Sequence, residues 1–85
     1  MKVFEYVVND ELGIHARPAG LLVKEAKRYA SKVMLKKADT EVDATRLMSV
    51  MAMGVKQGDC VTVTVEGEDE ETAYSGIRSF FENNL

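Results

Sequence analysis

The chain has no tryptophan and only one cysteine, one proline and one histidine, and these scarcities narrow the possible classes of protein. With Cys60 alone, no disulfide can form within the chain. Because Cys60 directly precedes Val61, we expect it to be a small buried hydrophobic residue and not a reactive thiol. No apolar run approaches the roughly 20 residues that span a bilayer. The start of the chain lacks the features of a signal peptide, so we expect a soluble cytoplasmic protein.

An excess of positive charge is also lacking, because 11 Lys and Arg stand against 14 Asp and Glu and the formal net charge is −3. A general nucleic-acid-binding protein usually carries a clear excess of basic residues, so the charge argues against that class. The 85 residues, 46% of them hydrophobic, suffice for a single thin core. We therefore expect one domain over residues 1–85.

Hydrophobic periodicity predicts seven elements in the order βαββαβα. Strict alternation indicates strands over 2–8, 32–37, 41–43 and 60–66. Apolar residues at three- and four-residue spacing indicate three helices. The first runs from about residue 16 to 29, and the second runs from Thr45, as its N-cap, through residue 53. The third follows Gly67 along a last apolar stripe. The hairpin at residues 38–40 favours an α+β fold, a four-stranded, mostly antiparallel sheet with helices on one face.

Residues 13–19, Gly-Ile-His-Ala-Arg-Pro-Ala, form the segment with the clearest chemistry. Neutral imidazole is a good nucleophile near neutral pH, and the unpaired N–H groups of a helix N-terminus favour an anion. Arg17 can offer a fork of donors to phosphate oxygens, and Pro18 fits an early helical position. His15 is therefore a candidate for reversible phosphorylation. A lone histidine is, however, more often a surface or capping residue, and Arg-Pro is common at helix starts.

The same seven residues resemble the active-site signature of HPr, the small histidine-containing phosphocarrier of the bacterial phosphoenolpyruvate-dependent sugar phosphotransferase system. Residues 47–54, Leu-Met-Ser-Val-Met-Ala-Met-Gly, resemble the second helix of that family. Residues 65–70, Val-Glu-Gly-Glu-Asp-Glu, resemble its last strand and following turn. Since the three segments occur in order and at matching spacing, the resemblance covers nearly the whole chain.

The resemblance implies an open-faced β-sandwich of four antiparallel strands and three helices, and a carrier role. Enzyme I would pass a phosphoryl group to Nδ1 of His15, and His15 would pass it to an EIIA domain of a sugar permease. Arg17 would be the phosphate partner, and the backbone N–H groups of Ala16 and Arg17, with Pro18 beside them, would form the phosphate site. Such a carrier holds the phosphoryl group covalently, needs no cofactor or metal, and is not an independent enzyme.

Two groups of side chains are candidates for contact with protein partners. Lys24, Lys27 and Arg28 share a face of the first predicted helix, which on its own is typical of a solvated surface. Leu47, Met48 and Met51 form an apolar group on the second helix, and such groups more often belong to a core. In HPr-like proteins these two helices frame the histidine and dock onto enzyme I and EIIA. We therefore expect an apolar contact patch with Lys24 and Lys27 beside it, on a protein that is a monomer.

One position departs from the family pattern. Many HPr proteins of the Gram-positive type carry a regulatory serine at the start of the second helix, where this chain has Arg46. Arginine cannot accept that phosphate, and we interpret the neighbouring Thr45 as a cap and Ser49 as a helix-surface residue. We therefore expect a carrier without the usual serine switch.

Two other classes remain as alternatives. A regulatory HPr-like paralogue, of the nitrogen-related or the catabolite-repression type, would bind a regulator protein. The catabolite-repression type tends to lose the histidine and keep the serine, the reverse of this chain. An unrelated metal or hydrolytic site is weakly supported, because His15 has no second ligand at suitable spacing and no catalytic triad nearby.

Overall fold

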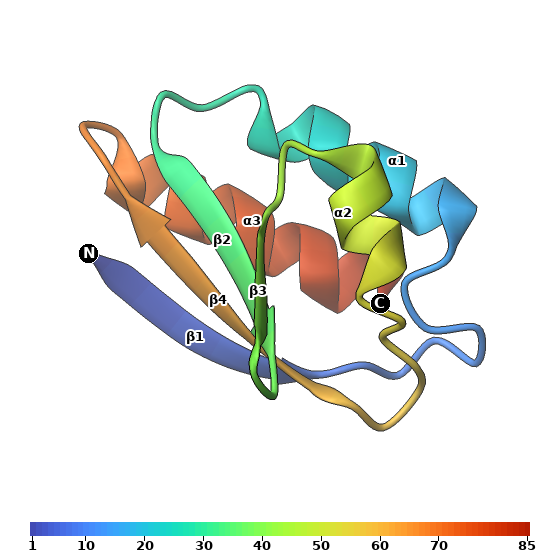
Figure 1. The fold of residues 1–85 in the computed structure, drawn as a ribbon. Helices are drawn as coiled ribbons and strands as arrows, with labels where there is room; N and C mark the ends of the chain where they lie inside the picture. The colour runs from blue at the N-terminus through green and yellow to red at the C-terminus, as the bar shows by residue number, and fades with distance from the viewer.

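Four strands form one antiparallel sheet in the order β1-β4-β2-β3, and three helices cover one of its faces (Figure 1). This computed structural model describes residues 1–85 and confirms the predicted α+β fold and the order βαββαβα. No helix combines the length and the apolar character that a membrane-spanning segment needs. The elements are β1 (Lys2–Val7), α1 (Ala16–Ala26), β2 (Lys32–Lys37), β3 (Thr40–Asp43), α2 (Leu47–Ala52), β4 (Cys60–Glu66) and α3 (Glu70–Asn84).

The core lies between the sheet and the helices, because only one face of each strand is apolar. Along β4 the side chains of Val61, Val63 and Val65 are fully buried. Burying each such side chain contributes about 1.5–3 kcal/mol, so this strand is a main source of stability. Phe81 of α3 packs edge-to-face on Phe4 of β1, so these two buried rings join the helix layer to the sheet. The opposite face of the sheet is left uncovered.

Helix α1 ends at Ala26, three residues before the predicted end at Tyr29. The N–H groups of Arg28 and Tyr29 bond to carbonyls only three residues back, which tightens the last turn. The N–H groups of Ala30 and Ser31 then donate to the carboxylate of Asp69 instead of to helix carbonyls. A contact with a residue nearly forty positions away therefore ends the helix, and no local sequence signal announces it.

The prediction of Thr45 as the N-cap of α2 was wrong. Arg46 occupies the N-cap position and makes no side-chain capping bond, and α2 begins at Leu47. The hydroxyl of Thr45 donates instead to the carboxylate of Asp43, at 2.7 Å. This bond closes a side-chain turn at the end of β3, and short polar side chains often prefer such local bonds to capping.

Cys60 is exposed, which contradicts the prediction that it is buried. Successive side chains of a strand point to opposite faces of the sheet. Since Val61 points into the core, Cys60 must point to the uncovered face, where its register partner Val7 of β1 is also exposed. Adjacency to an apolar strand misled the prediction, because the period of two places neighbours on opposite sides.

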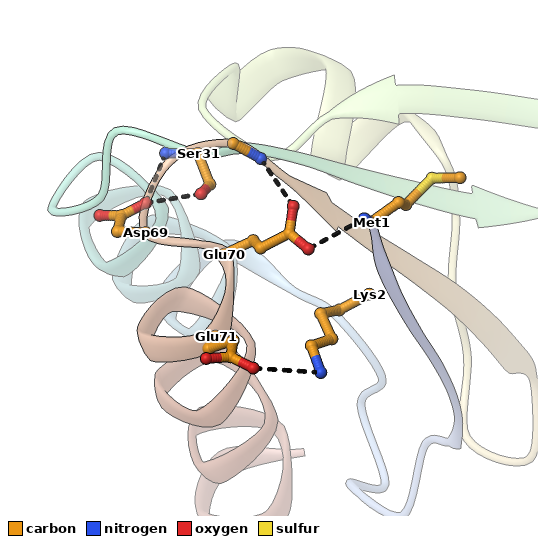
Figure 2. Close-up of polar contacts among 7 residues, drawn as sticks. Met1, Lys2, Ser31, Asp69, Glu70 and Glu71 are labelled. Atoms are coloured by element: carbon orange, nitrogen blue, oxygen red, sulfur yellow. Dashed lines mark hydrogen bonds and ion pairs between the residues drawn. The ribbon is translucent and has the colours of Figure 1, made fainter.

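The end of the sheet opposite the α1 N-terminus is fastened by polar contacts at the start of α3 (Figure 2). Asp69 accepts hydrogen bonds from the hydroxyl and the N–H of Ser31. Glu70 accepts from the N–H of Gly67 and from the amino group of Met1, which lies 2.9 Å from its carboxylate. The hydrogen bond from the Ser31 hydroxyl, followed by the one from the Ala30 N–H, lowers the pKa of the Asp69 carboxyl.

We predict that Asp69→Ala destabilises the protein near neutral pH, and that the difference from the wild type shrinks in acid. Because folding lowers the pKa of Asp69, its stabilising contribution is complete above the unfolded-state pKa and is lost as the pH falls through the folded-state pKa. Urea unfolding at pH values from about 7 down to about 2 measures this difference. Glu68→Ala is the matched control, since Glu68 is an exposed carboxylate of the same loop. A constant difference across the pH range would contradict the account.

Candidate functional site

Main-chain hydrogen bonds hold the loop between β1 and α1 against the turn before β4 and against the end of α3. Val8 exchanges bonds with the turn before β4, through the carbonyl of Asp59 and the N–H of Gly58. The N–H groups of Asn9 and Asp10 both donate to the carbonyl of Leu85, at the far end of α3. The side chain of Leu85 is buried, so this acceptor is fixed by the core. The loop is therefore a rigid platform for the residues that follow it.

Gly13 fits against the backbone of Val55 so closely that no side chain can replace its hydrogen. Its φ is +67°, and a Cβ atom there would lie 2.2 Å from the carbonyl oxygen of Val55. The next N–H, from Ile14, donates to that same carbonyl at 3.1 Å. The side chain of Ile14 is buried, so both its hydrogen bond and its packing hold the chain in place immediately before His15.

His15 stands at the N-cap of α1 with an extended backbone. Its carbonyl accepts the first helical hydrogen bond, from the N–H of Ala19 at 2.8 Å. Its side chain makes no capping bond and is 36% exposed, with Nε2 lying 3.8 Å from Oδ1 of Asp10. The structure thus places a partly exposed imidazole at a helix start, in agreement with the surface alternative, and excludes a capping hydrogen bond from its side chain.

The first turn of α1 offers free donors beside the imidazole. The N–H groups of Ala16 and Arg17 have no acceptor within the protein, and the exposed Arg17 side chain makes no ion pair or hydrogen bond. Unpaired N–H groups and the helix dipole together favour an anion at this place. Pro18 is buried and has no N–H, so it can shape a phosphate site but cannot donate to it.

A depression of about 300 Å³ opens at the imidazole. Sequence reasoning anticipated three of its residues, His15, Arg17 and Pro18, but missed the side chains from elsewhere. Asp10 lies in the loop just before the motif, whereas the two last residues of α3 lie most of the chain away, and no local pattern reveals either contribution. The depression is lined by Asp10, His15, Arg17, Pro18, Leu21, Asn83 and Asn84.

The apolar side chains predicted as a contact patch on α2 are exposed. Leu47, Met48 and Met51 retain 41%, 77% and 39% of their surface, whereas Val50 and Met53 are buried. We call Leu47, Met48 and Met51 the α2 patch. Helix α1 contacts α2, and two further apolar residues that the sequence did not flag, Leu12 and Leu21, are exposed near its N-terminus.

The three basic residues at the end of α1 divide into two kinds. Lys24 and Lys27 are exposed and make no ion pair, which leaves their charges free. Arg28 lies beyond the helix and pairs with Glu25 at 3.1 Å. The expected basic face is therefore reduced to the two lysines, because α1 ends earlier than predicted and Arg28 turns toward its own helix.

Comparison with known proteins agrees with this geometry. Residues 2–83 match the family model described as the PTS HPr component phosphorylation site. The phosphocarrier protein HPr of Treponema pallidum is 43% identical over 78 residues, covering 92% of this chain and 89% of the relative. The HPr-C-His structure from Thermoanaerobacter tengcongensis superimposes with a TM-score of 0.92 at 35% identity, covering 98% of this chain and 93% of the other.

The fold and these relatives together define a small histidine-containing phosphocarrier. The chain belongs to the HPr family of the phosphotransferase system. The catabolite-repression protein Crh of Bacillus subtilis, solved as a swapped dimer, is also similar, with a TM-score of 0.78 at 36% identity over 92% of this chain and 90% of the other. The catabolite-repression alternative is therefore no better supported than the phosphocarrier role.

We predict that Gly13→Ala is more damaging than Gly54→Ala, although both glycines have nearly the same positive φ. Each alanine costs about 1–2 kcal/mol for the left-handed conformation. Gly54 has open space where its Cβ would lie, whereas Gly13 faces the Val55 carbonyl. The clash should cost Gly13→Ala about 1–3 kcal/mol more in the free energy of unfolding. Urea denaturation measures both values, and equal losses would contradict the close approach at Gly13.

Proposed function

We propose that His15 is the residue that carries the phosphoryl group, through Nδ1. The single observation that supports this most strongly is a half-exposed imidazole at the N-cap of α1, beside the unbonded N–H groups of Ala16 and Arg17. The imidazole supplies the nucleophile, and the helix start supplies a place for the negative oxygens. The Arg17 guanidinium, free of any protein carboxylate, is the third donor.

The residues of the site do little chemistry beyond placing these groups. Phosphoryl transfer depends mainly on position and on compensation of charge. A carrier must also give the group away, so stabilisation of phosphohistidine has to be modest. An exposed Arg17 and two main-chain N–H groups suit that need, because water still reaches the site and weakens each interaction.

We propose enzyme I as the donor and EIIA domains as acceptors, with the exchange taking place in the cytoplasm and the carrier acting as a monomer. The exposed Leu21 lines the depression at His15, and the α2 patch adds exposed apolar surface on the helix that α1 contacts. Lys24 and Lys27 place positive charge on α1 and would steer acidic partners. An acidic protein can thus present a locally basic and apolar face to its partners.

Regulation by a serine kinase is absent from this proposal. Arg46 holds the N-cap of α2, the position where the family often has its regulatory serine. The nearest hydroxyl, that of Thr45, is engaged with Asp43. The proposed carrier therefore lacks an acceptor at the usual site.

We predict that incubation with enzyme I and labelled phosphoenolpyruvate places acid-labile label on the wild type and none on His15→Ala. Arg17→Ala should still fold and should take up label roughly 10- to 100-fold more slowly, because a hydrogen bond to a charged group is lost. Rapid-quench sampling gives the rates, and circular dichroism checks the fold. Label on His15→Ala, or no label on the wild type, would remove His15 from the proposal.

We also predict that Met48→Ser weakens transfer between enzyme I and this protein, raising the KM roughly tenfold with little change in stability. Met48 is the most exposed member of the α2 patch, so its loss removes apolar contact area from a docked partner and not from the core. Val3→Ser is the matched control, an exposed apolar residue of β1 on the uncovered face of the sheet. Equal effects of the two substitutions would exclude the α2 patch as a docking surface.

A further inference from the structure

Asp10 lies beside the imidazole, and the proposed phosphoryl transfer through His15 and Arg17 does not use it. Its Oδ1 atom is 3.8 Å from Nε2 of His15 and accepts a hydrogen bond from the N–H of Leu12 at 2.9 Å. The carboxylate is half-buried, with a third of the side chain exposed. Among the seven residues that line the depression, Asp10 is the one carboxylate. Nothing else of negative charge therefore faces the ring from within this depression.

The main chain around Asp10 is fixed before any partner arrives. Its N–H donates to the carbonyl of Leu85, and its own carbonyl accepts from the N–H of Gly13, at 2.9 Å in each case. The bond to Leu12 fixes the side chain as well. The gap to Nε2 is about 1 Å longer than a hydrogen bond, and such contacts commonly tighten when a reacting partner binds.

We infer that Asp10 is a positioning residue that holds the proton of neutral His15 on Nε2 and so leaves the lone pair on Nδ1. A neutral imidazole carries one N–H, and the partner of one ring nitrogen decides which nitrogen bears it. A carboxylate near Nε2 favours the Nε2–H form. The unprotonated Nδ1 is then on the other side of the ring, away from Asp10 and available to the donor phosphoryl group.

This inference rests on the proposed function and adds the balance of charge during transfer. Nδ1 attacks phosphorus, the new N–P bond forms, and the electron pair of the breaking bond stays with the leaving atom of the donor. The Nε2 proton does not move, so the ring of His15 becomes a cation while its phosphoryl oxygens remain anionic. Asp10 offsets the charge at Nε2, and Arg17 faces the oxygens. The return step reverses each change.

The test uses Asp10→Asn, which removes the charge but keeps an oxygen that can accept from Leu12. Nitrogen-15 chemical shifts of the two ring atoms, measured on the isolated protein near pH about 8.5, give the ratio of the two neutral forms. We expect the Nδ1–H fraction to rise roughly two- to fivefold, the size set by a partly exposed charge pair. Phosphoryl uptake from phospho-enzyme I should fall by a similar factor. Glu11→Gln, an exposed neighbour with the same change in net charge, should alter neither quantity.

The two readouts separate failure of this inference from failure of the proposed function. An unchanged ratio of ring forms in Asp10→Asn overturns the role of Asp10, whether or not enzyme I phosphorylates the protein. A shifted ratio with unchanged uptake overturns the charge balance assigned to Asp10. If the wild type takes up no phosphoryl group, the proposed function fails, while the nitrogen shifts still decide whether Asp10 fixes the ring.

Discussion

The contact on which the site depends is the hydrogen bond from the Ile14 N–H to the Val55 carbonyl, with Gly13 pressed against the same peptide. It joins the start of α1 to the segment that follows α2, so two helices far apart in sequence meet at one place. Because Ile14 is buried beyond this bond, the chain cannot rotate to bring His15 inside. The imidazole is left at the helix N-cap, where main-chain N–H groups have no other acceptor.

The sheet and its contacts hold this part of the chain in place. The side chains that each strand buries face the helices, which cover one face of the sheet (Figure 1), whereas Val3 and Val7 of β1 are exposed on the other face. Lys37 at the end of β2 donates to the carbonyl of Gly54 and pairs with Asp59, which stabilises the segment around Val55. Rigidity of the site therefore comes from the sheet, whereas the exposed surfaces of α1 and α2 remain free for partners.

The sequence predicted those features that follow from local patterns. Alternation placed β2 and β4 correctly, and the heptapeptide located the imidazole, Arg17 and the helix start. Competing polar contacts produced the errors in the helix bounds. Asp69 ends α1 from a distant part of the chain, and Asp43, only two residues away, takes the Thr45 hydroxyl that was expected to cap α2. The contact of Leu85 with the loop that carries Asp10 was likewise not predicted. The sequence does not predict these hydrogen-bond partners, because each polar residue has several possible partners and only the folded structure determines which one it meets.

We propose that His15 and the first turn of α1 form one phosphate site. An NMR spectrum of the phosphorylated protein, with amide and phosphorus signals assigned, tests this proposal. We expect phosphorus coupling to Nδ1 of His15 and downfield shifts of the Ala16 and Arg17 amide protons, as new hydrogen bonds to phosphate form. Coupling to Nε2, or amide signals of Ala16 and Arg17 that stay in place, would contradict it.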